Sequence, residues 1–140
     1  MTDRVPIVGG GIAGLTTALC LAHHQVPSIV YEQAKAFDEV GAGIQISPNA
    51  IEILRALGLL GRLRSYAVAP TRIRLHDGRS NTDLADVPLG DVAERRYGAP
   101  YLVIHRADLQ RVLVEACQEN AAITIELGAT IDPDPSARLV

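Results

Sequence analysis

Aromatic side chains are scarce in this 140-residue chain, which has no tryptophan, one phenylalanine and four tyrosines. Proteins that hold single-stranded nucleic acid stack the bases on several aromatic rings, and this chain has too few for such a platform. Basic residues are not in excess either: 13 lysines and arginines stand against 16 aspartates and glutamates, giving a net charge of −3. Because a nucleic-acid binder carries a basic face, we expect no nucleic-acid partner.

Cysteine and histidine are also sparse. The two cysteines, Cys20 and Cys117, each fall in a predicted helix, and their spacing fits neither a metal site nor a redox pair. We therefore interpret both as small buried apolar residues. His23 and His24 are adjacent, so they point to different faces of a helix and cannot share one metal ion. We predict no metal site.

The chain lacks an uninterrupted apolar segment of the length that a membrane span needs. Residues 5–22 are mostly apolar, but three consecutive glycines interrupt them where a spanning helix must be continuous. Asp3 weakens the positive region that a secretory signal requires, and no stop-transfer pattern follows. With 48% hydrophobic and 21% charged residues, the composition is that of a globular protein. We predict a cytoplasmic protein with no membrane partner.

The most informative feature that is present lies in residues 7–32, which read IVGGGIAGLTTALCLAHHQVPSIVYE. An apolar strand leads into a Gly-x-Gly-x-x-Gly turn, a helix of small residues, and a second strand that ends in Glu32. In such a unit Gly9 allows a sharp turn, Gly11 lets backbone N–H groups approach a pyrophosphate, and Gly14 lets the helix pack closely on the sheet. The helix N-terminus also attracts phosphates. Glu32 stands eighteen residues after Gly14, near the spacing of an acid that binds a ribose hydroxyl.

Periodicity and turn residues predict an α/β fold for the whole chain. The first part is expected to contain a strand at 5–8, a helix at 12–24, a strand at 28–32 and a loop at 33–46. A helix from Pro48 to about 57 follows, with Ser47 as N-cap and Gly58 at C′, and then a strand at 71–76, a turn at Asp77-Gly78 and loop residues through Gly98. The last part is expected to contain a strand at 101–104, an amphipathic helix at 106–119, a strand at 123–127 and a further β segment from Gly128 to Val140.

Four motifs in this order resemble one family: GGGIAGL, the YEQA around Glu32, GAGIQISPNAIEILRALGLL at 41–60 and YLVIHRADLQRVLVEA at 101–116. They are similar to the N-terminal portion of class A flavin monooxygenases, and most similar to the salicylate and 3-hydroxybenzoate hydroxylase branch. The resemblance covers nearly all of residues 5–131. It implies a Rossmann-like FAD-binding domain of the glutathione reductase type, incomplete here. Residues 1–69 and 101–140 would be part of that domain, and residues 70–100 a strand-rich excursion toward a substrate domain.

The resemblance also implies a role for each matching residue near the adenosine half of FAD. The residues implied to hold the pyrophosphate are Gly9, Gly11, Ile12, Ala13 and Gly14. Glu32 would bind the adenosine ribose, and its neighbour Gln33 would lie on the adenine side.

A second group of residues matches family positions near the other half of FAD. Gly43, Ile44 and Gln45 match a loop near the flavin and its ribityl chain, and Arg106 matches an arginine that reaches FAD from the start of a helix. A guanidinium fork suits phosphate and ribityl oxygens. Since a helix N-terminus mildly disfavours a cation, a functional reason for Arg106 is favoured. Ile131 would lie near the adenine.

The function implied is that of an FAD-dependent monooxygenase, which hydroxylates an aromatic acid or phenol with NAD(P)H and O₂. Its partners would be O₂ and a small aromatic substrate, and the cofactor would carry the hard chemistry. Two later family motifs, of the Gly-Asp-Gly and Gly-Asp-Ala types, are absent, so the chain looks truncated or partial. We assign no catalytic residue, and we expect poor solubility or dependence on a partner, and no turnover from these residues alone.

Two alternatives stay open. One is an NAD-binding dehydrogenase domain, because Glu32 would serve an NAD ribose equally well, although the loop at 41–46 and Arg106 favour FAD. The other is a truncated fragment that binds flavin without catalytic activity.

Overall fold

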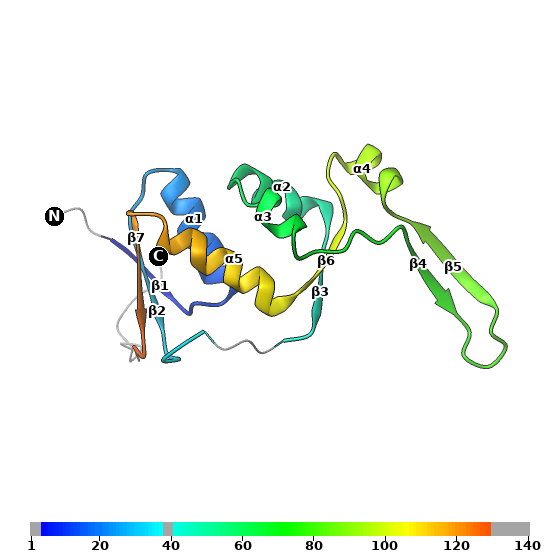
Figure 1. Ribbon diagram of the computed structural model, residues 1–140, viewed down its shortest axis with the longest axis horizontal. Helices are drawn as coiled ribbons and strands as arrows, with labels where there is room; N and C mark the ends of the chain where they lie inside the picture. Colours follow the sequence, from blue (N-terminus) through cyan, green and yellow to red (C-terminus); the bar gives the residue numbers. More distant parts are fainter. Residues whose placement is uncertain (1–3, 38–40, 130–140) are drawn as a thin grey trace, which may run out of the picture. The chain divides into compact units, whose positions relative to one another are not determined.

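The computed structural model describes residues 4–37 and 41–129 (Figure 1). Its elements are β1 (Val5–Val8), α1 (Ile12–His23), β2 (Ser28–Glu32), β3 (Gly43–Ile46), α2 (Pro48–Ala56), α3 (Leu60–Arg64), β4 (Arg72–His76), β5 (Asp83–Pro88), α4 (Asp91–Tyr97), β6 (Leu102–His105), α5 (Arg106–Gln118) and β7 (Ile123–Leu127). None of the helices in these two ranges is long and apolar enough to cross a membrane.

The chain divides into two compact units, and the boundary falls within α5. Unit 1 contains residues 1–39 and 113–140, and unit 2 contains residues 40–112. The predicted grouping of 1–69 with 101–140 in one FAD-binding domain, with 70–100 as an excursion, stays a prediction. Of the β segment predicted from Gly128 to Val140, Gly128 and Ala129 form no strand, and the rest lies outside the described residues, as does Ile131.

Unit 1 is a parallel three-stranded sheet in the order β1-β2-β7, and α1 contacts all three strands (Figure 1). The helix packs well because Leu15, Ala18 and Leu19 recur on one side and are buried. From the sheet, Val30 and Ile123 are buried in the same unit. The strand–helix–strand order and the parallel pairing confirm the predicted Rossmann-like α/β fold.

Pro6 lies inside β1, where a residue without an N–H group is unusual. Val5 donates its N–H to the Pro27 carbonyl at 2.9 Å, and Gly9 donates to the Tyr31 carbonyl at 2.8 Å. Because donors alternate along a strand, the nitrogen of Pro6 points away from β2. Among the described strands β1 pairs only with β2, so Pro6 interrupts no ladder here.

Unit 2 contains a two-stranded antiparallel ribbon formed by β3 and β6. Ile46, Leu102 and Ile104 are buried on one face of this ribbon. The prediction of a loop at 33–46 was therefore wrong for residues 43–46, which form β3. Two glycines around Ala42 favour a loop locally, but pairing with β6, some sixty residues later, supplies backbone partners that local sequence does not show.

Helix α2 begins and ends as predicted. Ser47 is its N-cap residue, Pro48 its first residue, and Gly58 follows the C-cap with φ of +76°, the left-handed conformation that favours glycine. The serine hydroxyl contacts the Asn49 side chain and makes no capping hydrogen bond to the backbone. The short helix α3 was not predicted, and the expectation of loop residues through Gly98 was wrong for 83–88 and 91–97, which form β5 and α4.

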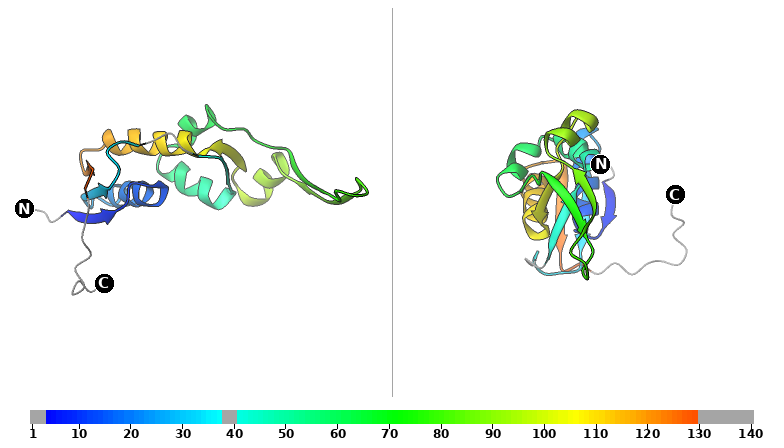
Figure 2. Two further views of the ribbon diagram at one scale, coloured as in Figure 1. Left: turned by 90° about the horizontal axis from the view of Figure 1, so that it is seen from below. Right: turned by 90° about the vertical axis from the view of Figure 1, so that its right-hand side faces the viewer.

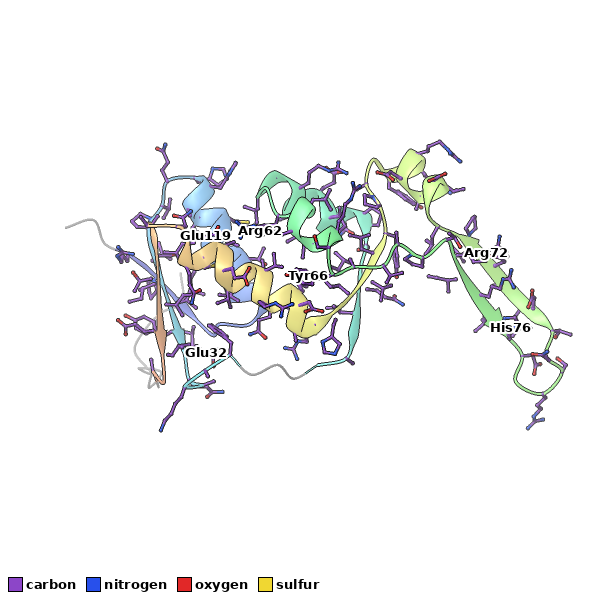
Figure 3. All side chains as sticks on the ribbon, in the orientation of Figure 1. Glu32, Arg62, Tyr66, Arg72, His76 and Glu119 are labelled. Carbon is purple, nitrogen blue, oxygen red and sulfur yellow. The ribbon has the colours of Figure 1, made fainter. Side chains whose placement is uncertain are left out.

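Strands β4 and β5 form a hairpin that extends from α4 as a two-stranded ribbon (Figures 1 and 2). The predicted turn at Asp77-Gly78 is confirmed, since Oδ1 of Asp77 accepts the N–H groups of Arg79 and Ser80. Every residue of both strands is exposed. One face carries apolar residues, and the other carries charged ones: Ile73, Leu75, Ala85 and Val87 on the first, and Arg72, Arg74 and Asp86 on the second. Arg72 and His76 are labelled in Figure 3.

Candidate cofactor site

The glycine-rich turn between β1 and α1 has the backbone geometry that its sequence predicts. Gly9 has φ of +96°, a conformation that residues with side chains rarely adopt, and it reverses the chain directly after Val8. Gly11 then acts as the N-cap residue of α1 in an extended conformation. Three glycines therefore connect the end of β1 to the start of α1.

Gly14 and Gly11 differ in what a side chain would meet. A Cβ atom on Gly14 would lie 2.0 Å from the carbonyl oxygen of Gly9 and 3.3 Å from Cγ2 of Ile7, so only glycine fits. A Cβ atom on Gly11 would have no atom of the chain within 4 Å. Gly14 is thus required by packing inside unit 1. Nothing in the described chain requires a glycine at Gly11, which is the pattern expected where a ligand approaches the backbone.

No side chain of α1 caps the backbone N–H groups of its first turn. Gly11 has no side chain to cap the helix, no side-chain cap hydrogen bond forms, and the first turn contains no acidic residue. The leading N–H groups of a helix lack intrahelical acceptors, and with the helix dipole they favour an anion. Ile12 and Ala13 supply two of these groups at positions 1 and 2 of the helix.

Glu32 ends β2 and connects its strand to the glycine turn (Figure 3). Its Oε2 accepts the N–H of Gly10 at 2.6 Å, and its Oε1 accepts the N–H of Ala34 at 2.9 Å. These bonds stabilise the charged form, so the Ala34 and Gly10 N–H groups hold the pKa of Glu32 below its ordinary value of 4.5, against a small opposing effect of burial. An ionised carboxylate has about four lone-pair sites, more than these N–H groups fill, so it can still accept a ribose hydroxyl.

Gly10 and Phe37 are site residues that sequence reasoning missed. A Cβ atom on Gly10 would lie 2.8 Å from Cε1 of Phe37 and 3.1 Å from Oε2 of Glu32. The middle glycine of the triplet is therefore needed for the contact with Glu32, and the only phenylalanine of the chain closes the other side. The available signal was the middle glycine of the GGG triplet, because within that triplet the fingerprint asks for glycine only at the first and last positions.

These features fit the pyrophosphate and ribose of a dinucleotide. The turn leaves space over Gly11, the start of α1 offers uncapped N–H groups, and an ionised carboxylate ends the second strand. Gln33, the remaining residue predicted here, is exposed directly after Glu32.

The other predicted site residues lie in unit 2. Gly43, Ile44 and Gln45 are the first three residues of β3, and Gly43 is paired with His105, the residue before Arg106. Arg106 is the exposed first residue of α5, and its N–H donates to the Ala42 carbonyl at 3.1 Å. The structure thus brings Arg106 next to the β3 residues, as it brings Glu32 next to the glycine turn. Each group is defined within its own unit.

Comparison with known proteins identifies one family over most of the chain. Residues 2–132 match the family described as FAD binding domain. The 3-hydroxybenzoate 6-hydroxylase 1 of Aquipseudomonas alcaligenes is 40% identical over 131 residues, which are 94% of this chain and 33% of that protein. The 3-amino-4-hydroxybenzoate 2-monooxygenase PtmB3 of Streptomyces platensis is 46% identical over 112 residues, 80% of this chain and 28% of that protein. The chain thus spans about a third of the length of these relatives.

Solved structures agree on the fold. The p-nitrophenol 4-monooxygenase PnpA from Pseudomonas putida DLL-E4 matches with a TM-score of 0.78 at 23% identity, over 90% of this chain and 32% of that one. The flavin-dependent monooxygenase PieE, in complex with FAD and substrate, matches with a TM-score of 0.73 at 24% identity, over 89% of this chain and 23% of that one. The predicted resemblance to class A flavin-dependent aromatic hydroxylases is confirmed. The match favours FAD over the NAD-binding dehydrogenase alternative.

Proposed function

Because this chain belongs to the family of FAD-binding domains, we propose that its unit 1 holds the adenosine and pyrophosphate half of FAD. The pyrophosphate would lie over Gly11 and accept N–H groups of Ile12 and Ala13, while Glu32 would accept the hydroxyls of the adenosine ribose. The observation that supports this most directly is at the start of α1, where the open space over Gly11 adjoins backbone N–H groups that no side chain caps.

The flavin half of the cofactor is assigned to unit 2 in the same proposal. Gly43, Ile44 and Gln45 would lie along the flavin and its ribityl chain. Arg106 would direct its guanidinium to phosphate or ribityl oxygens, for which a planar fork with five donors is well suited. Its backbone is held for this by the hydrogen bond to Ala42, and Gly41 packs against its stem, since a Cβ atom there would lie 2.8 Å from Cβ of Arg106.

The reaction that we propose for the whole protein is hydroxylation of a small aromatic acid or phenol with O₂ and NAD(P)H. FAD supplies the redox chemistry when bound, and the protein supplies binding, orientation and exclusion of water. The relatives' names support an aromatic acid as substrate, since they refer to 3-hydroxybenzoate, 3-amino-4-hydroxybenzoate and 6-hydroxynicotinate. A cytoplasmic location belongs to the same proposal, and cell fractionation tests it.

The variant Gly11→Ala tests the cofactor site without disturbing the fold. Gly11 has φ of −74°, which alanine adopts readily, and its new methyl group would meet no atom of the chain. It would stand where the pyrophosphate is expected. We predict an unchanged far-ultraviolet circular dichroism spectrum and an FAD affinity lowered about 100-fold or more, which corresponds to roughly 3 kcal/mol.

Flavin fluorescence quenching measures that affinity, and Gly61→Ala is the matched control. Gly61 lies in α3, also has open space around its Cα, and belongs to no predicted site. An FAD affinity of Gly11→Ala equal to that of Gly61→Ala would refute the site. A chain that binds NAD but not FAD would instead support the dehydrogenase alternative, and bound FAD without NADH oxidation in the presence of hydroxybenzoates is the result expected of these residues alone.

A further inference from the structure

The β3–β6 ribbon of unit 2 has one buried face and one open face. Alternation along the paired strands puts Ile46, Leu102 and Ile104 on the buried face. Gly43, Gln45 and His105 alternate to the opposite face, and all three are exposed. A Cβ atom on Gly43 would meet nothing within 4 Å, so no part of the described chain covers this end of the face.

A hydrogen bond joins two side chains on the open face. The hydroxyl of Tyr101 donates to Oε1 of Gln45 at 2.6 Å. In the antiparallel register Gln45 is opposite Val103, so Tyr101, two residues earlier, is its diagonal neighbour on the same face. Oε1 is the acceptor atom of the Gln45 amide. The bond from Tyr101 therefore uses Oε1 and leaves the two N–H donors on Nε2.

Tyr101 is a fixed donor because the chain on both sides of it is buried. Ala99 and Pro100 precede it and Leu102 follows it, and each has a buried side chain. Val103 is held in addition by two hydrogen bonds of 2.8 Å with the backbone of Val68, on the edge of β6 away from β3. The hydroxyl of Tyr101 therefore has a defined position, and its donation to Oε1 of Gln45 leaves Nε2 of that amide on the far side of the bond.

Within residues 4–37 and 41–129, no acceptor is found for the Nε2 hydrogens of Gln45. An exposed glutamine without a partner would rotate freely and would be a donor or an acceptor to a ligand with equal ease. The bond to Tyr101 restricts that rotation. The open face consequently presents a donor at Gln45, beside a glycine that leaves room for a ligand.

We propose that Tyr101 is a positioning residue that orients the Gln45 amide, so that Nε2 donates to a carbonyl or hydroxyl oxygen of the flavin half of FAD. This inference rests on the proposed function. It adds a residue that was not among the predicted site residues, and it gives Gln45 a specific role as a donor. Flavin ring carbonyls and ribityl hydroxyls both accept hydrogen bonds, so either can bond to an N–H donor at this position.

A double-mutant cycle on the 140-residue chain tests the proposal. Tyr101→Phe removes only the hydroxyl, and we expect it to weaken FAD binding about threefold to tenfold, the value of one net hydrogen bond. In the Gln45→Ala background the same change should have no effect, because Tyr101 acts through Gln45. Tyr97→Phe, at an exposed tyrosine of α4, is the control and should leave the affinity unchanged.

Titration with ADP in place of FAD separates this proposal from the proposed function. ADP has no flavin, so its affinity should be equal in wild type and Tyr101→Phe. Loss of ADP affinity in Tyr101→Phe would mean a general structural effect and would overturn the positioning role. An equal loss of FAD affinity with and without Gln45, or no loss at all, would overturn it as well. A wild-type chain that binds neither FAD nor ADP would refute the proposed function, and the positioning role would fall with it.

Discussion

Replacing Glu32 by glutamine tests how strongly one side chain holds the glycine turn in place. The carboxylate accepts two backbone N–H groups on two different oxygens, Gly10 on Oε2 and Ala34 on Oε1. Glutamine has the same shape but only one acceptor oxygen. In either orientation of its amide, one N–H group therefore faces an NH₂ group and loses its acceptor.

The magnitude follows from these two bonds. Hydrogen bonds to a charged group contribute about 1.5–3 kcal/mol each, and neutral ones about 0.5–1.5 kcal/mol. One bond is lost and the other becomes neutral, but Glu32 is half-exposed, so water offsets part of the loss. We expect Glu32→Gln to lower the free energy of unfolding by about 1–2.5 kcal/mol.

The pH dependence of stability provides a second signature. Because the pKa of Glu32 is lowered in the folded chain, its stabilising effect is fully present above the ordinary value of 4.5 and is lost as the pH falls through the folded-state pKa. Glutamine does not titrate. The difference in stability between wild type and Glu32→Gln should therefore shrink as the pH is lowered below 4.5.

Urea unfolding followed by circular dichroism at pH 7 and at acid pH measures both effects. With an m-value of about 1–3 kcal/mol per molar urea, we expect the midpoint to fall by roughly 1 M at pH 7. Glu126→Gln is the control, since Glu126 is an exposed glutamate of β7 in the same unit. Equal midpoints for Glu32→Gln and Glu126→Gln would refute the idea that the carboxylate holds the turn.

Two further predictions concern packing and thiol chemistry in unit 1. Gly14→Ala should destabilise the chain by about 3 kcal/mol or more, since its Cβ would lie 2.0 Å from the Gly9 carbonyl oxygen. Thermal unfolding checks this, and a melting temperature equal to that of Gly61→Ala would contradict it. Burial raises the pKa of Cys117 to about 11, so at pH 8 a thiol reagent should modify the half-exposed Cys20 first, and both thiols only after denaturation. Equal rates of modification of the two thiols in the folded chain would contradict the burial of Cys117.

Sequence reasoning succeeded where the signal is local. The strand, turn and helix around Gly9 and Gly14 follow from backbone freedom, close packing and periodicity within some thirty residues. Helix α5 follows from a regular apolar stripe, and Leu109, Val112, Leu113 and Cys117 on that stripe are buried. These elements could be predicted because each residue's requirement is met by near neighbours.

The failures have a different physical origin. Strand β3 is defined by its partner β6, and the bond between Gly10 and Glu32 joins residues 22 positions apart, so neither contact is visible in a short window. Helix α4 has seven residues, fewer than an isolated helix needs, although acids at its start and arginines at its end do suit the helix dipole. The bond between Tyr101 and Gln45 depends on the register of the same ribbon, so it became visible only once that register was known.

The hairpin of β4 and β5 has a consequence for how the chain opens. A two-stranded hairpin is marginally stable in water, and here both strands are exposed, with Leu75 58% accessible. Its backbone amides should therefore exchange with deuterium by local opening, well before those of β2 or of the β3–β6 ribbon. A segment that opens by itself transmits little strain to its surroundings. Replacements on the exposed faces of this hairpin should therefore have little effect on the stability of the residues around Glu32.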